Sequence, residues 1–217
     1  MQAPETNEKA KPPRSGLVLA AGLASRMHHR PKALLERDGV ALIRRNALAL
    51  LTLSLDQVVV VIGHEAHRMT RALQDLPIEI VINPKAQEGQ ASSLQCGLRA
   101  LTSAACDVMV ALADMPLIEP SDLPPIWQAF DQRPSGCHFV QPFDGERVGN
   151  PVVLAAQLVS EWQKAKEPVL GQLWQKQNPN AVHRWLTNSP HYFVDLDTPE
   201  DLALVQSQYG VRLEWPQ

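Results

Sequence analysis

The sequence predicts a single α/β domain organised around a mainly parallel β-sheet. Apolar runs typical of buried strands alternate with amphipathic segments of about a dozen residues, which is the pattern of βαβ units. The length of 217 residues suits one domain. The composition, 45% hydrophobic and 20% charged, is that of a globular chain and excludes a disordered one.

The first half of the chain has the most regular alternation. Residues 57–62 are Gln followed by an unbroken run of Val and Ile, which is typical of a strand buried on both faces. The strand expected at 78–82 is ended by Asn83-Pro84. In chain order we expect strand 16–21, helix 41–51, strand 57–62, helix 65–76, strand 78–82, helix 90–101 and strand 108–112.

The second half is less regular, but its last helix has a clear start. Thr198 is expected as the N-cap, Pro199 takes the first helical position, and acidic residues follow in the first turn. We expect strands at 137–141, 151–154 and 192–196, and helices at 156–164, 169–177 and 199–208. Residues 1–14 are expected to form a flexible tail, residues 15–210 the domain, and residues 211–217 a C-terminal tail.

Charge and cysteine content exclude several classes of protein. The net charge of -3 argues against a nucleic-acid-binding protein, which usually carries excess positive charge. Cys96, Cys106 and Cys137 form no C-x-x-C pair, so neither a zinc site nor a redox dithiol is indicated, and a reduced, cytoplasmic setting fits. The apolar runs are far shorter than the roughly 20 residues that a membrane helix needs, so no membrane partner is expected.

The loop after the first strand is a candidate phosphate-binding segment. Gly22 permits a tight turn at the carboxyl end of a strand, where ligands of parallel sheets gather. Arg26 and Lys32 add positive charge and hydrogen-bond donors for phosphate oxygens. Neither a Walker motif nor a G-x-G-x-x-G motif is present. The alternative is a solvated basic loop around a tight turn.

Carboxylates follow two of the later apolar segments. Asp114 stands just after the strand expected at 108–112, where a hard cation bridging phosphates would find a ligand; the alternative is an Asp that begins a turn before Pro116. Asp195 and Asp197 lie two residues apart on an extended segment, so both side chains point the same way. Two carboxylates on one side are costly unless a cation or donors meet them. Capping and exposed acids are the alternative.

The first loop carries a family resemblance. The stretch from Leu19 through Met27, followed by Lys32, resembles the L-A-A-G-x-[SG]-x-R-M-G-…-K signature of MobA-like nucleotidyltransferases. His28 stands where that family usually has Gly, and Ala24 stands where it usually has Gly or Ser. In the family the loop wraps the triphosphate of a nucleotide and the Lys meets its phosphates. The nucleotide-binding residues that the resemblance implies here are Leu19, Ala20, Ala21, Gly22, Ser25, Arg26 and Lys32.

Further motifs continue the resemblance in the family's order, from about residue 16 to 204. The stretch from Glu88 to Leu94 is similar to an E-G-M-S-S-S-[LI] segment near bound ligand, which adds Gly89, Ser92 and Ser93; helix capping by the serines is the alternative. The G-[HN]-P-V element implies an acceptor site at Gly149, Asn150 and Pro151. The family's D-x-P holds catalytic Mg²⁺ through Asp114, and its D-[IV]-D-T-P-E-D ending supplies a second ligand, for which we favour Asp197 over Asp195.

The resemblance is strongest to molybdenum cofactor cytidylyltransferases. It implies a three-layer, Rossmann-like, doubly wound sheet of the nucleotide-diphospho-sugar transferase type. It also implies a reaction in which the terminal phosphate of molybdopterin attacks the α-phosphorus of CTP and pyrophosphate leaves, with Lys32, Arg26 and Asp114 as catalytic residues. A monomer that docks transiently onto a molybdoenzyme or its chaperone is expected.

One departure keeps other activities open. The branch usually has a G-D-x-G-A-R stretch after the G-[HN]-P element, whereas the corresponding region here is 166–171, which keeps Glu167 but lacks the Arg. GTP or another phosphorylated acceptor is therefore an alternative. Some MobA-like proteins are NAD(P)H-dependent, nicotine-blue-type oxidoreductases, and a carrier that hands cofactor to an apo-enzyme is a third possibility.

Overall fold

The computed structural model describes residues 12–22, 27, 30–103 and 105–216. Within this part of the chain, seven strands form one sheet in the order β5-β4-β1-β6-β8-β7-β9. The strands are β1 (Arg14–Ala20), β4 (Gln57–Ile62), β5 (Glu79–Ile82), β6 (Asp107–Leu112), β7 (Phe139–Phe143), β8 (Val152–Leu154) and β9 (Val182–Leu186). β8 runs antiparallel to β6 and β7, and the other neighbouring pairs are parallel. The predicted mainly parallel α/β sheet is confirmed.

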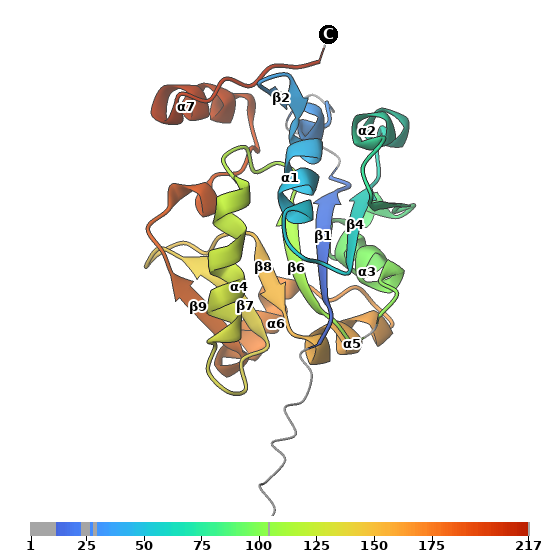
Figure 1. Ribbon diagram of the computed structural model, residues 1–217, viewed down its shortest axis with the longest axis vertical. Helices are drawn as coiled ribbons and strands as arrows, with labels where there is room; N and C mark the ends of the chain where they lie inside the picture. Colours follow the sequence, from blue (N-terminus) through green and yellow to red (C-terminus); the bar gives the residue numbers. More distant parts are fainter. Residues whose placement is uncertain (1–11, 23–26, 28–29, 104, 217) are drawn as a thin grey trace, which may run out of the picture.

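Helices cover both faces of the sheet, which makes three layers (Figure 1). Alternation along β1 explains this arrangement, because Val18 and Ala20 enter one apolar cluster while Leu17 and Leu19 enter the other. The first cluster includes residues of α1 (Leu42–Leu51), α2 (Ala66–Leu73) and α4 (Leu123–Asp131). The second includes residues of α3 (Gln90–Ala100), α5 (Ala156–Lys164) and α6 (Gly171–Gln177).

A third apolar cluster lies beyond the carboxyl end of β6. Its buried members come from widely separated parts of the chain: Met27, Leu35, Leu42, Leu117, Leu196 and Val205. It joins the two-stranded hairpin of β2 (Glu36–Arg37) and β3 (Val40–Ala41) to α7 (Pro199–Tyr209). Residues 211–216 are expected to be part of a tail. In the structure Val211, Leu213 and Trp215 pack on this cluster, and Glu214 forms an antiparallel bridge with Glu36.

The expected strand at 192–196 is wrong. Residues Pro190–Phe193 form a 3₁₀ helix, η6, whose first position is taken by proline. Tyr192 is buried there because its ring packs in the first cluster and its hydroxyl donates a hydrogen bond to the Asp122 carbonyl over 2.7 Å. The apolar residues at 192–196 are therefore explained by packing of a 3₁₀ helix and the irregular segment after it, and not by a strand.

The sequence did not predict β9, α4, the short strands β2 and β3, or the short 3₁₀ helices. The last strand of the sheet is β9, whose sequence includes His183 and Arg184 because it lies at an edge and is largely solvent-accessible. Helix α4 carries Pro124 and Pro125 in its first turn, where proline is tolerated. Apart from the strand expected at 192–196, the predicted helices and strands agree with expectation to within three residues at each end.

Helix α3 approaches the sheet closely through a glycine. A Cβ at Gly97 would lie 2.4 Å from Leu17 Cδ1 and 2.7 Å from Val61 Cγ2, both in the core. Only a residue without a side chain permits this distance, so Gly97 sets the position of α3 over β1 and β4.

We expect Gly97→Val to destabilise the protein by about 2–3 kcal/mol, because added methyl groups overpack the core. Gly171→Val is the matched control, since the atom nearest to a Cβ there is Trp162 Cη2 at 3.9 Å; its effect should stay within about 0.5 kcal/mol. Urea unfolding followed by circular dichroism measures both. Equal midpoints for the two variants would contradict the close packing assigned to α3.

Candidate active site

A cavity of about 390 Å³ opens at the edge of the sheet where β1 and β6 end. Ligands of α/β sheets bind at this edge. The cavity is formed by the loop after β1, the start of α3, the end of β6 and the segment before α7. The predicted site residues that line it are Leu19, Ala21, Gly22, Gly89, Ser93, Asp114 and Asp197.

A smaller hollow adjoins this cavity and brings in two more predicted residues. It has a volume of about 40 Å³ and includes Ala20 and Lys32 in its wall. Leu19, Gly22 and Asp114 border both hollows. Ser25 and Arg26, also predicted for this loop, lie outside the described residues.

Lys32 bridges two carboxylates at the junction of the two hollows. Its Nζ lies 2.8 Å from Asp114 Oδ2 and 2.9 Å from Asp197 Oδ1. Burial alone would lower the pKa of Lys32, but attraction to Asp114 and hydrogen bonds to both carboxylates outweigh it and raise that pKa. The ammonium group is therefore kept charged next to the cavity.

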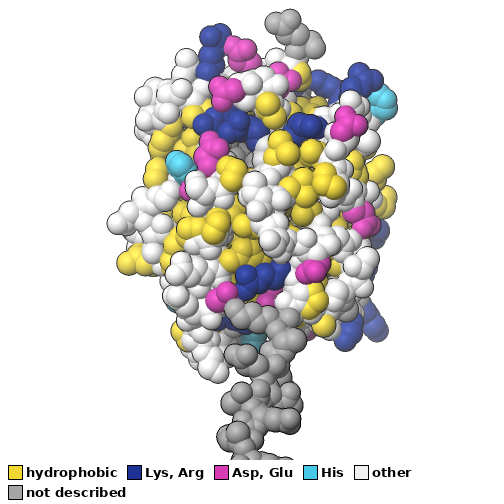
Figure 2. Space-filling model, in the orientation of Figure 1, with side chains coloured by type: hydrophobic (Ala, Val, Ile, Leu, Met, Phe, Trp, Pro, Cys, Tyr) yellow, Lys and Arg dark blue, Asp and Glu magenta, His cyan; other side chains and the backbone are white. Residues whose placement is uncertain are grey.

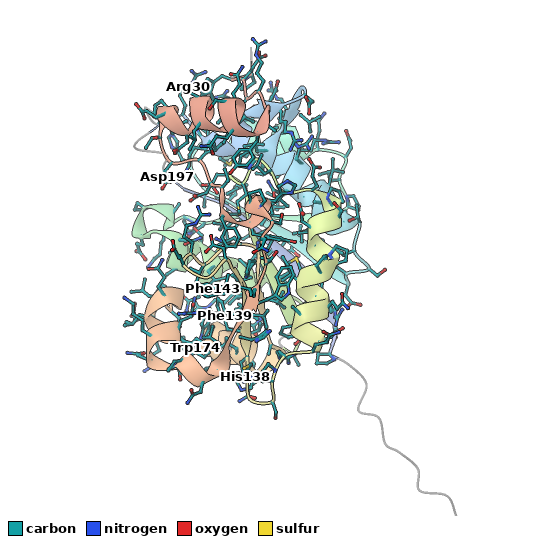
Figure 3. All side chains as sticks on the ribbon, turned by 90° about the vertical axis from the view of Figure 1, so that its left-hand side faces the viewer. Arg30, His138, Phe139, Phe143, Trp174 and Asp197 are labelled. Atoms are coloured by element: carbon teal, nitrogen blue, oxygen red, sulfur yellow. The ribbon has the colours of Figure 1, made fainter. Side chains whose placement is uncertain are left out.

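The segment before α7 brings two carboxylates to Asp114. The Leu196 amide donates a hydrogen bond to the Asp114 carbonyl over 3.2 Å, which fixes the segment against the end of β6. Asp195 and Asp197 both line the cavity, as their spacing predicts. Burial, together with the negative charges of Asp114 and Asp197, raises the pKa of Asp195. Asp197 lies just before α7, as Figure 3 shows.

The N-terminus of α7 holds Asp197 in place. The Asp201 carboxylate accepts hydrogen bonds of 2.7 Å from the amides of Asp197 and Thr198, and Thr198 completes a capping box. Burial would raise the pKa of Asp201, but these hydrogen bonds lower it, so the capping carboxylate remains ionised. The expected N-cap at Thr198 is confirmed.

Ion pairs fix the loop that follows Asp114. Arg37 donates a hydrogen bond to the Pro116 carbonyl over 2.9 Å and pairs with Glu119 at 2.8 Å. Arg45 of α1 pairs with the same Glu119 carboxylate at 3.2 Å. Figure 2 shows basic and acidic side chains close together in the upper part of one face, above an apolar area. The hairpin and α1 thus hold the turn that presents Asp114.

The start of α3 borders the cavity through Gly89, Gln90 and Ser93. Gly89 is the N-cap and has a φ of 94°, a conformation that favours glycine. Because the first amides of a helix have no partners within it, this end of the helix is suited to an anion. Ser92 does not line the cavity: its hydroxyl donates a hydrogen bond to the Lys85 carbonyl over 3.0 Å.

Two residues that the sequence analysis did not single out for the site hold this region together. Buried Asn83 donates hydrogen bonds to the hydroxyls of Ser92 and Ser93 at 3.0 and 3.1 Å. At Gly63, a Cβ would lie 2.7 Å from Ala86 and 3.0 Å from Ala21, so the glycine lets two walls of the cavity meet. An Asn at the end of a strand and a Gly after a Val-Ile run were the available signals.

The chain offers a donor set that suits Mg²⁺. Within the described residues no three His, Cys, Asp or Glu side chains form a metal-binding group. Asp114 and Asp197 are instead two carboxylates that already share one cationic group, Lys32 Nζ. Mg²⁺ is typically held by one or two carboxylates together with substrate phosphates and water, rather than by a protein cage. The residues therefore fit this ion.

The predicted acceptor residues lie at the same edge of the sheet but outside both hollows. Val152, just after Pro151, pairs with Val110 near the end of β6. The Asn150 amide donates a hydrogen bond to the Tyr192 carbonyl over 2.9 Å, and Gly149 packs so closely that a Cβ would lie 2.4 Å from that same oxygen. Their binding of an acceptor stays a prediction.

Comparison with known proteins gives the same fold. Rv0371c from Mycobacterium tuberculosis H37Rv superposes with a TM-score of 0.74 at 20% identity, over 91% of this chain and 99% of that one. A nucleotidyl transferase from Methanothermobacter thermautotroptrophicus superposes with a TM-score of 0.72 at 22% identity, over 90% of this chain and 97% of that one. A CMP:2-keto-3-deoxy-manno-octonic acid synthetase complexed with CTP superposes with a TM-score of 0.69 at 14% identity, over 91% of this chain and 98% of that one.

Curated relatives match part of the chain. The bifunctional protein GlmU of Synechococcus sp. (strain JA-3-3Ab) is 34% identical over 107 residues, which are 49% of this chain and 17% of that protein. Nicotine blue oxidoreductase of Paenarthrobacter nicotinovorans is 33% identical over 102 residues, 47% of this chain and 50% of that one. The chain thus spans half or less of each of these relatives.

The family model described as the MobA-like NTP transferase domain matches residues 16–182. This match covers most of the chain, including the loop after β1, the start of α3 and Asp114. The resemblance to MobA-like nucleotidyltransferases and the fold class expected from the sequence are confirmed. The chain belongs to the MobA-like NTP transferase family.

Proposed function

We propose that this protein is a Mg²⁺-dependent nucleotidyltransferase that transfers CMP from CTP to the terminal phosphate of molybdopterin and releases pyrophosphate. The observation that carries the proposal is the meeting of Lys32, Asp114 and Asp197 beside a cavity bordered by Gly22 and the start of α3. Family membership supports the reaction class. The choice of CTP and molybdopterin depends on the sequence resemblance.

The chain's own residues supply binding and electrostatics. The Gly22 turn and the first amides of α3 are suited to the phosphates of a nucleotide in the cavity. Asp114 and Asp197 would hold Mg²⁺, which when bound neutralises charge on the phosphates. Lys32, which now pairs with these carboxylates, is within reach to stabilise charge that develops on the departing pyrophosphate.

No general base is needed for this transfer. The attacking phosphate is already ionised at neutral pH, so catalysis consists of placing two anions together and neutralising their repulsion. The acceptor end is less defined by the chain. Gln95 of α3 donates hydrogen bonds to the carbonyls of Ala165 and Glu167, which fixes the stretch where the branch's G-D-x-G-A-R motif would lie. GTP or another phosphorylated acceptor therefore stays an alternative, as does docking to a molybdoenzyme.

A second candidate is an NAD(P)H-dependent dye oxidoreductase. The 33% identity with nicotine blue oxidoreductase favours it. The absence of a G-x-G-x-x-G motif from the sequence disfavours it. The melting temperature separates the two, because a ligand stabilises the folded state that binds it. CTP with Mg²⁺ should raise the melting temperature, whereas stabilisation by NADPH alone would favour the oxidoreductase.

Within the described residues no helix is long and apolar enough to cross a membrane.

The decisive experiment is the exchange of labelled pyrophosphate into CTP, GTP and ATP in the presence of Mg²⁺. We expect label in CTP when molybdopterin is supplied, because forward and reverse transfer of CMP between CTP and this acceptor incorporates labelled pyrophosphate. Label in GTP alone would keep the reaction class and change the base. Label in none of the three would reject nucleotidyl transfer to molybdopterin.

Replacement of the first carboxylate should abolish Mg²⁺-dependent transfer. In Asp114→Ala we expect a loss of at least about 100-fold in kcat/KM, because a ligand for the cation and a partner of Lys32 are removed. Circular dichroism should remain that of the folded protein. Glu161→Ala, which removes an exposed carboxylate on α5, is the control. A wild-type rate for Asp114→Ala would disprove its role.

Replacement of the bridging lysine tests the cationic side of the site. We expect Lys32→Met to reduce kcat by about 100-fold or more, since an electrostatic group next to the leaving phosphates is lost. Lys85→Met is the matched control, because the Lys85 side chain is 67% exposed and pairs with Glu88 on the surface. Single-turnover rates measure both. Equal rates for the two variants would mean that Lys32 serves only to pair with the carboxylates.

A further inference from the structure

The segment after α7 crosses the third apolar cluster and contacts the loop that leads to Lys32. Val211, Leu213 and Trp215 are partly buried against this cluster, while Arg212 and Glu214 are exposed. This alternation is that of a strand with one face inward. In Figure 1 the segment passes beside β2 on its way to the C-terminus.

Two kinds of contact attach this segment to the first loop. Glu214 and Glu36 exchange backbone hydrogen bonds of 2.7 and 3.0 Å, two residues after η2 (Lys32–Leu34) ends. Trp215 lies under Arg30, whose guanidinium carbon is 4.0 Å from the centroid of the indole ring. Arg30 is in turn two residues before Lys32, so the segment holds the chain on both sides of the bridging lysine.

The same cluster also anchors the acidic side of the site. Met27 of the first loop and Leu196 are both buried in it, and Leu196 stands between Asp195 and Asp197. The partly buried residues of 211–216 pack against this cluster. Packing at this one place therefore bears on the position of the basic loop and of the two carboxylates.

We propose that residues 211–216 act as a strap that holds residues 30–36, and with them Lys32, in the position that binds nucleotide, with Trp215 as a positioning residue that acts through Arg30. This proposal rests on the proposed function, since the site that it positions is the nucleotide site. If residues 30–36 are already held in place, they lose less conformational entropy when the ligand binds. The strap should therefore affect nucleotide affinity more than the rate of the chemical step.

The test compares Trp215→Ala with Trp215→Phe and with Tyr209→Ala. A phenyl ring retains a face for the guanidinium group, whereas alanine does not. Tyr209 of α7 packs against the same cluster, and its replacement controls for general loosening. With CTP and Mg²⁺, we expect Trp215→Ala to raise KM in pyrophosphate exchange, and Kd by calorimetry, about fivefold with kcat within about twofold. Trp215→Phe should restore most of the affinity, and Tyr209→Ala should raise KM less than Trp215→Ala does.

A second readout does not depend on catalysis. Hydrogen–deuterium exchange of the amides of residues 30–36 should be faster in Trp215→Ala than in the wild type or in Tyr209→Ala. An unchanged KM and unchanged exchange in Trp215→Ala, or equal effects in Tyr209→Ala, would overturn the strap. If the wild-type protein labels no nucleotide, the proposed function fails, and hydrogen exchange alone decides whether the strap orders this loop.

Discussion

The site depends on the ion pairs that join Lys32 to Asp114 and Asp197. These residues come from the beginning, middle and end of the chain, and they meet only if the loop after β1, the end of β6 and the segment before α7 reach one edge of the sheet. An unpaired charge that is partly buried costs free energy, so each partner stabilises the position of the others. The ion pairs thus restrict how these three parts of the chain can be arranged.

The parallel sheet satisfies this constraint through its register. Leu19 of β1 lies opposite Leu112 of β6, so the residues that follow these two strands begin at the same level. Gly97 and Gly63 then allow α3 and the turn around Ala86 to approach β1, β4 and the loop after β1. A bulkier residue at Gly97 would push α3 away from β1 and β4, and one at Gly63 would push the turn around Ala86 away from Ala21.

Strands that are buried on both faces could be predicted, because their sequences are unbroken apolar runs. β4 and β6 are such strands, and their limits agree with expectation to within one residue. β9 leaves no such record, because an edge strand accepts His183 and Arg184. The hairpin of β2 and β3 is too short for periodicity, although Asp38-Gly39, both with positive φ, is a turn signal of the expected kind. β9 forms by pairing with β7, which lies far from it along the chain, whereas β2 and β3 pair with each other across this turn.

Some residues of the site could likewise be predicted from local sequence, whereas others could not. Gly22, Lys32 and Asp114 stand immediately after apolar runs or in a recognisable motif, so local sequence indicates them. Asn83 and Trp215 carry no motif, and their roles arise from contacts with residues 9 and 185 positions away. Trp215 in particular meets Arg30 only because α7 and the hairpin pack on one apolar cluster. The cavity is therefore bordered by residues from the first loop, the end of β6 and the segment before α7, whereas residues 214 and 215 contact Glu36 and Arg30 on either side of Lys32.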